Sequence, residues 1–178
     1  MFKFPSLHLA LAAVLSLLVN GLPAQARDYK QLASICDAAV PAPAAERIAA
    51  CSQLIDSNTL APKDQALAHL HRSWPLSQTG QKPRAFEDLN AAASLDPLSA
   101  YVLSDRGFLH LRMGKTGLAI RDYSAALKLN PRTVYALYGR GIAYSRLGRK
   151  AEGLADLDAA RGMLANVDNV FAGLGVRP

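Results

Sequence analysis

The sequence predicts an all-α protein built from repeated helical hairpins. Its hydrophobic residues, 51% of the chain, are largely alanine and leucine, whereas valine and isoleucine, which favour strands, are scarce. A second observation is an internal repeat. The stretch LAIRDYSAALKLNP at residues 118–131 resembles RAFEDLNAAASLDP at residues 84–97, which stands 34 residues earlier, and GLADLDAARGMLA at residues 153–165. One hairpin cannot bury its apolar faces alone, so repeated copies are expected to stack and share a core.

Residues 1–26 have the layout of a secretory signal peptide. Lys3 gives a short basic start, residues 7–19 form an apolar run, and Ala24 and Ala26 make a small-x-small cleavage site. The run is too short for a helix that spans a membrane, although an uncleaved N-terminal anchor is the alternative. We therefore expect an exported protein, periplasmic or secreted, with residues 27–178 as the mature domain and no membrane span after cleavage.

The first element of the mature chain is predicted to be an atypical hairpin within residues 27–65. Residues 28–40 and 44–57 are its expected helices, and they carry Cys36 and Cys51. Two cysteines in an oxidising compartment predict one disulfide, whereas a redox dithiol would normally have C-x-x-C spacing. The two cysteines lie at unequal distances from the turn. That difference can be absorbed if residues 44–47 are partly turn rather than helix.

Three similar units follow, at residues 66–99, 100–133 and 134–167. Each has a glycine at the same position, and these are Gly80, Gly114 and Gly148. Glycine can adopt a left-handed conformation, so it is expected to end the first helix of each hairpin. Pro97 and Pro131 are expected to start the next helix, where a missing N–H costs little. Pro75 falls inside a predicted helix and is expected to kink or disturb it.

The units resemble the tetratricopeptide repeat. The resemblance is carried by RGFLHLRMGKTGLAIRDYSAALKLNP at residues 106–131 and RGIAYSRLGRKAEGLADLDAA at residues 140–160. It implies a right-handed solenoid of about three repeats. Residues 168–178 would form a short helix that caps its C-terminal end. It also implies that the inner faces of the first helices line a groove that binds a protein or peptide.

Two sets of residues recur at fixed positions in the three units. The first set pairs an arginine with an aspartate, namely Arg72 with Asp88, Arg106 with Asp122, and Arg140 with Asp156. A catalytic site is normally unique, so we interpret these pairs as structural ion pairs between the helices of one hairpin.

The second set comprises the positions that line the groove in the tetratricopeptide family. The groove residues predicted here are Trp74, Tyr101, Ser104, Phe108, Arg112, Tyr135, Tyr138, Ile142 and Arg146. Aromatic residues and arginine are enriched at binding hot spots, although an aromatic stripe at helical spacing can also be core. The family's basic clamp for a terminal carboxylate is absent, because Asp105 and Gly139 are among the residues at its positions.

No motif for catalysis, cofactor binding or metal binding is found. His69 and His71 are two residues apart, so they do not share a helix face. The net charge of +6 is spread along the chain, which does not indicate a nucleic-acid partner. We therefore expect a non-enzymatic protein–protein interaction module. The alternatives are a structural or assembly accessory of a cell-envelope complex that binds through its convex face or termini, and, far behind, a cell-wall hydrolase with a degenerate motif. The partner's identity and the oligomeric state stay open.

The signal peptide gives a first testable prediction. Cleavage after Ala26 should leave Arg27 as the first residue of the exported protein. Intact-mass measurement on protein from the producing cell's envelope or medium should show the shortened chain. A full-length mass confined to the cytosol would contradict export and remove the basis for an oxidised cysteine pair.

Overall fold

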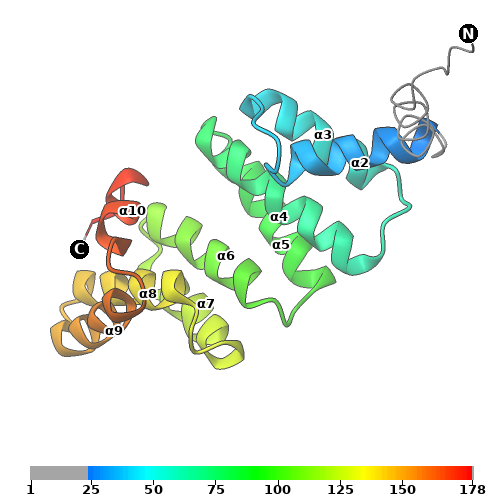
Figure 1. Ribbon diagram of the computed structural model, residues 1–178. Helices are drawn as coiled ribbons and strands as arrows, with labels where there is room; N and C mark the ends of the chain where they lie inside the picture. Colours follow the sequence, from blue (N-terminus) through cyan, green and yellow to red (C-terminus); the bar gives the residue numbers. More distant parts are fainter. Residues whose placement is uncertain (1–23, 178) are drawn as a thin grey trace, which may run out of the picture.

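The computed structural model describes residues 24–177, which form nine α-helices and no strand (Figure 1). The predicted all-α fold of sequential hairpins is therefore confirmed. Most of the predicted signal peptide, residues 1–23, lies outside the described residues. Within residues 24–177, none of the helices combines the length and the apolar content that crossing a membrane requires.

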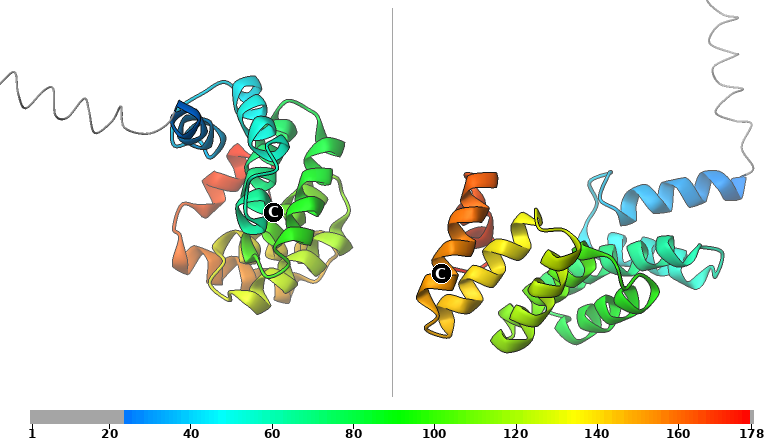
Figure 2. Two further views of the ribbon diagram at one scale, coloured as in Figure 1. Left: turned by 90° about the vertical axis from the view of Figure 1, so that its right-hand side faces the viewer. Right: turned by 90° about the horizontal axis from the view of Figure 1, so that it is seen from below.

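Consecutive helices pair as antiparallel hairpins that stand side by side, with the N-terminal pair at one end of the array and α9 and α10 at the other (Figures 1 and 2). The helices are α2 Ala24–Cys36, α3 Ala44–Asp56, α4 Pro62–Gln78, α5 Lys82–Leu95, α6 Ala100–Arg112, α7 Thr116–Leu129, α8 Val134–Arg146, α9 Lys150–Met163 and α10 Val167–Gly173. The first helices of the second and third repeats begin at the predicted residues, whereas α4 begins before residue 66.

The hairpin turns depend on glycines with positive φ angles. Gly114 has a φ of 72° and Gly148 a φ of 75°, a region that other residues rarely adopt. The residue after each glycine donates its N–H to a carbonyl of the helix it follows, and Lys115 reaches the oxygen of His110 at 2.9 Å in this way. These bonds satisfy carbonyls that the helix end would otherwise leave unpaired, so the predicted role of the glycines is confirmed.

The predicted roles of two prolines need correction. Pro97 and Pro131 do not start helices, because they lie in the turns before α6 and α8. The N–H of Ser99 reaches the oxygen of Asp96 at 3.3 Å, which makes Pro97 the second residue of a β-turn, where its fixed φ is favourable. Helix α4 continues past Pro75 to Gln78, although this proline has no N–H to donate to the carbonyl four residues earlier, and the predicted kink stays a prediction.

Tyr123 of α7 fills the space between the hairpins α6–α7 and α8–α9, and its side chain is fully buried. A Cβ atom built on Gly107 of α6 would lie 3.0 Å from its ring. One built on Gly139 of α8 would lie 2.8 Å from Cε2 and closer still to Cζ and the hydroxyl. The absence of a side chain at both glycines therefore lets α6 and α8 approach the same phenol. This packing joins the two hairpins into one core that extends to Phe171 of α10.

Each repeated arginine connects its own hairpin to the preceding one. Arg106 donates to both carboxylate oxygens of Asp122, at 2.8 and 2.7 Å, and its Nη1 donates to Asn90 of the preceding hairpin at 3.3 Å. The same arrangement recurs twice, with Arg72, Asp88 and Ser52, and with Arg140, Asp156 and Ser124. A planar guanidinium suits this double role because it presents five N–H donors in a fixed plane.

In the N-terminal hairpin, Cys36 and Cys51 are joined by a disulfide with their Cα atoms 4.9 Å apart. The expectation that residues 44–47 are partly turn is wrong, because α3 begins at Ala44. Instead α2 ends at Cys36 rather than at residue 40, and Ala38 in the connection has a φ of 64°. Closing a loop with a sequence separation of 15 residues stabilises the folded chain by roughly 3 kcal/mol in the chain-entropy model.

A matched pair of glycine substitutions tests the packing around Tyr123. Gly139→Ala should lower the free energy of unfolding by roughly 1–3 kcal/mol, because the methyl group overlaps a fully buried ring. Gly117→Ala is the control. It adds the same atom to an exposed position of α7 with no neighbour within 4 Å, and should be neutral or stabilising by up to about 1 kcal/mol. Urea unfolding followed by circular dichroism measures both. Equal effects would mean that the phenol does not restrict the approach of α8.

Candidate functional site

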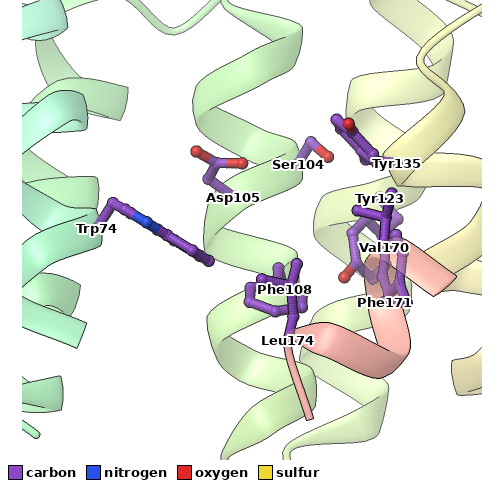
Figure 3. A pocket seen from close by; sticks show the side chains of 9 residues that line it. All are labelled: Trp74, Ser104, Asp105, Phe108, Tyr123, Tyr135, Val170, Phe171 and Leu174. Atoms are coloured by element: carbon purple, nitrogen blue, oxygen red, sulfur yellow. The ribbon is translucent and has the colours of Figure 1, made fainter. Parts of the chain in front are cut away.

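The first helices of the three repeats, α4, α6 and α8, direct aromatic side chains toward a common surface. We call the surface formed by Trp74, Phe108 and Tyr135 the inner groove. It contains a pocket of about 210 Å³, which is lined by Trp74, Ser104, Asp105, Phe108, Tyr123, Tyr135, Val170, Phe171 and Leu174. Figure 3 shows Trp74 on one side of the pocket and Tyr135 with the α10 side chains on the other. Most of the lining is apolar, with few polar groups, as in many ligand sites.

Helix α10 forms one wall of this pocket. Phe171 is 2% exposed, and its ring centroid lies 5.8 Å from that of Phe108 and 6.1 Å from that of Tyr135. The helix is held in place by Asp168, which accepts a hydrogen bond from the Tyr138 hydroxyl at 2.5 Å and two from Arg161 at 2.9 and 2.8 Å. The C-terminal segment was expected to close the apolar end of the solenoid, but it also enters the inner groove.

The predicted groove residues differ in their accessibility. Tyr101 and Tyr135 are 69% and 48% exposed, whereas Trp74 and Phe108 are partly buried against each other and Ser104 is buried at the pocket wall. The two predicted basic residues lie at the C-terminal ends of α6 and α8. Arg112 donates to the Ser77 hydroxyl at 3.1 Å, and Arg146 donates to the carbonyl of Leu111 at 3.2 Å.

Two of the predicted groove residues are corrected by the structure. Tyr138 is 1% exposed and Ile142 is fully buried, so both belong to the core rather than to an open groove. The ring of Tyr138 lies under α10, 4.5 Å from that of Phe171 between centroids. Burial and the hydrogen bond to Asp168 raise the pKa of Tyr138 to about 12. The covering helix explains the error, because helical spacing alone does not show which part of a face another segment covers.

Sequence reasoning gave no binding role to Asp105, which stands on the α6 wall of the pocket. Its carboxylate reaches solvent at the pocket mouth, but the surrounding walls remove much of its hydration and raise its pKa to about 6. It has no ion-pair partner among the described residues, unlike the paired Asp88, Asp122 and Asp156. The sequence does show an acid at a position where some members of the tetratricopeptide family bind a carboxylate with a basic residue. The desolvation of the Asp105 carboxylate could not be predicted, because it depends on the neighbouring helices.

Tyr123 is the second polar group of the pocket that the sequence did not identify as functional. Its side chain is buried between hairpins, yet its hydroxyl has no hydrogen-bond partner among the described residues. Burial raises its pKa well above the usual value, so the phenol stays protonated near neutral pH. A buried hydroxyl without a partner costs roughly 1–3 kcal/mol, which makes it a candidate for bonding to a ligand.

Another pocket, of about 290 Å³, lies between α2, α3 and α4 and includes Tyr29 and His71 in its lining. Its lining also includes Cys36 of the disulfide. Desolvation lowers the pKa of His71, so this histidine is largely neutral near neutral pH. This pocket lacks the convergence of aromatic rings from successive repeats, so the inner groove is the stronger candidate for partner binding.

Comparison with known proteins agrees with this architecture. The fold and the groove define a repeat protein built from helical hairpins. Residues 113–148 match the family model described as TPR repeat, the tetratricopeptide repeat. A TPR repeat is therefore recognised over residues 113–148, a segment that includes α7 and α8. No curated protein matches it.

Solved structures share the fold at low sequence identity. One crystal structure of MamA is 20% identical, with a TM-score of 0.59 over 67% of this chain and 68% of that chain. A structure of MamA from MSR-1 is also 20% identical, with a TM-score of 0.63 over 85% of this chain and 87% of that chain. The second TPR of Spaghetti (RPAP3), bound to the HSP90 peptide SRMEEVD, is 22% identical, with a TM-score of 0.55 over 62% of this chain and 98% of that chain.

The raised pKa of Asp105 gives a prediction about stability and pH. The folded state holds this proton more tightly than the unfolded state, whose ordinary pKa is 3.8. The ionised carboxylate therefore destabilises the fold, and this effect is absent below about pH 4, grows as the pH rises to about 6, and then stays constant. The melting temperature of Asp105→Asn should rise relative to wild type across this window, and carbon NMR should place the titration near pH 6. Glu87→Gln, an exposed acid on α5, is the control and should show no such trend. Titration of Asp105 near pH 4 would contradict the prediction.

Proposed function

We propose that this protein is an exported, non-enzymatic interaction module that binds a peptide or protein partner in the inner groove. The observation that carries the proposal is the convergence of Trp74, Phe108 and Tyr135 from three successive repeats, of which Tyr135 remains largely exposed. Tyr101 occupies the same position of its repeat as Tyr135 and is also largely exposed. Large aromatic rings on one surface supply much of the energy at protein interfaces. The TPR of RPAP3 bound to an HSP90 peptide supports this role by analogy of fold.

Export is part of the proposal. It is supported by the cleavage pattern at Ala24 and Ala26 and by the disulfide, since such bonds persist mainly outside the reducing cytosol. The inner groove is a rigid surface, because the arginine–aspartate pairs and Tyr123 fix successive hairpins relative to one another. A pre-organised surface binds its partner with less loss of conformational entropy.

A cross-linking experiment tests the position of the partner. A photoreactive amino acid placed at Tyr101 or Tyr135 should form covalent adducts with the partner in the producing cells. The matched control is Leu154, which is 55% exposed on α9 and lies outside the inner groove. Adducts confined to Leu154 would contradict groove binding and favour the alternative, an accessory that binds through its outer face.

The identified partner then allows a quantitative prediction. Replacing Tyr101 and Tyr135 together with alanine should weaken binding by at least about 2 kcal/mol, the level of an interface hot spot. Leu154→Ala should leave affinity unchanged. The stability of both variants should remain within about 0.5 kcal/mol of wild type, because the side chains removed are at the surface. Calorimetric titration and thermal unfolding measure the two effects. Unfolding of the double variant would show that these rings belong to the core.

A further inference from the structure

The pocket in the inner groove combines aromatic walls with an acidic group. The ring centroids of Trp74 and Phe108 are 6.2 Å apart, and those of Phe108 and Phe171 are 5.8 Å apart. Tyr135 completes the aromatic wall opposite Trp74 (Figure 3). Asp105 is the single acidic residue in the lining, which contains no lysine, arginine or histidine. The faces of aromatic rings carry partial negative charge and attract cations, and the guanidinium of Arg112 already lies over the ring of Phe108, 5.8 Å from its centroid.

Two of the lining side chains carry oxygen atoms without a partner among the described residues. Asp105 has no ion-pair partner among the described residues, and desolvation is the cause of the rise in its pKa. The Tyr123 hydroxyl is buried without a hydrogen-bond partner within residues 24–177, and Figure 3 shows it with the other lining side chains. Its oxygen can accept a hydrogen bond while its proton points away. A ligand that brings only N–H donors can therefore satisfy both residues.

We propose that this pocket binds the basic side chain, lysine or arginine, of the partner polypeptide that occupies the inner groove. The inference rests on the proposed function and specifies the chemistry of the partner. The aliphatic part of the side chain packs against the aromatic surface that Trp74 and Phe108 form together. Its charged end lies against the aromatic faces and donates hydrogen bonds to Asp105 and Tyr123. The pocket volume of about 210 Å³ equals the share of roughly seven water molecules, which is enough for such a side chain.

An acidic group is the alternative occupant, and the geometry disfavours it. A carboxylate in this pocket would lie beside Asp105, and two like charges repel each other. Two arginines lie near the pocket, since the guanidinium carbon of Arg112 is 5.8 Å from the Phe108 ring centroid and the charge of Arg146 offsets part of the rise in the pKa of Tyr123. Neither arginine lines the pocket, and they already donate to Ser77 and Leu111. Arg112 is about two helical turns, or roughly 10 Å, from Asp105 along α6.

Trp74 provides the measurement, because it is the only tryptophan in the chain and lines the pocket. Three capped peptides that differ at one position serve as probes: alanyl-leucyl-X-leucyl-alanine with lysine, norleucine or glutamate as X. Tryptophan fluorescence is followed as each peptide is titrated into the millimolar range. The lysine peptide should bind about tenfold or more tightly than the norleucine peptide, and the glutamate peptide should bind most weakly.

Matched variants assign the preference to the carboxylate. Asp105→Asn keeps the shape of the side chain and should abolish the tenfold preference for lysine, whereas Asp105→Glu should retain part of it. Glu87→Gln removes an exposed acid outside the groove and should leave the preference intact. Melting curves of the variants verify that each is folded, and the neutral peptide verifies that the pocket still binds.

The outcomes separate this inference from the proposed function. Equal binding of the three peptides, or a lysine preference that survives in Asp105→Asn, overturns the basic side chain as ligand while groove binding stands. Tighter binding of the glutamate peptide also overturns it. If none of the peptides changes the fluorescence, the pocket is not a site for basic side chains. The cross-links at Tyr101 and Tyr135 then decide independently whether a partner occupies the groove.

Discussion

The close approach of α6 and α8 to a single buried phenol is the constraint on which the rest of this structure depends. Tyr123 fits only because Gly107 and Gly139 have no side chain where its ring passes. The same helices bear Phe108 and Tyr135, so the packing that joins two hairpins also fixes the spacing of the pocket walls. Stability and recognition therefore share one contact, and a change that loosens the hairpins also changes the shape of the site.

Much of the fold could be predicted because the residues that form the hairpin turns recur in each of the three repeats. Gly80, Gly114 and Gly148 all have the positive φ that a tight turn needs, and α6 and α8 begin at the predicted residues. The predicted helix starts at Pro97 and Pro131 were wrong, because proline is favourable in more than one kind of local structure. Proline suits the first turn of a helix and the second position of a β-turn equally well, and only the hydrogen bond from Ser99 to Asp96 distinguishes them for Pro97.

The candidate site was less predictable, because it depends on residues that are distant in sequence. Helical spacing places Tyr135 and Tyr138 on neighbouring parts of one face, but α10 covers Tyr138 and leaves Tyr135 largely exposed. Asp105 by itself reads as an ordinary solvated acid, and its raised pKa arises only when other helices surround it. The polar residues that accept hydrogen bonds from the next hairpin, such as Asn90 and Ser124, could have been predicted from the sequence, because both occupy the same position of their repeats.

The disulfide between Cys36 and Cys51 affects the order in which the hairpins unfold. In a linear array each hairpin is stabilised mainly by its neighbours, so end units open first. The covalent link holds the N-terminal hairpin together even when its contacts with α4 are lost. At the other end, α10 is a short helix held by Asp168 and Phe171. Local opening should therefore begin at the C-terminus. The wall of the pocket that α10 supplies would open before the array itself loses its order.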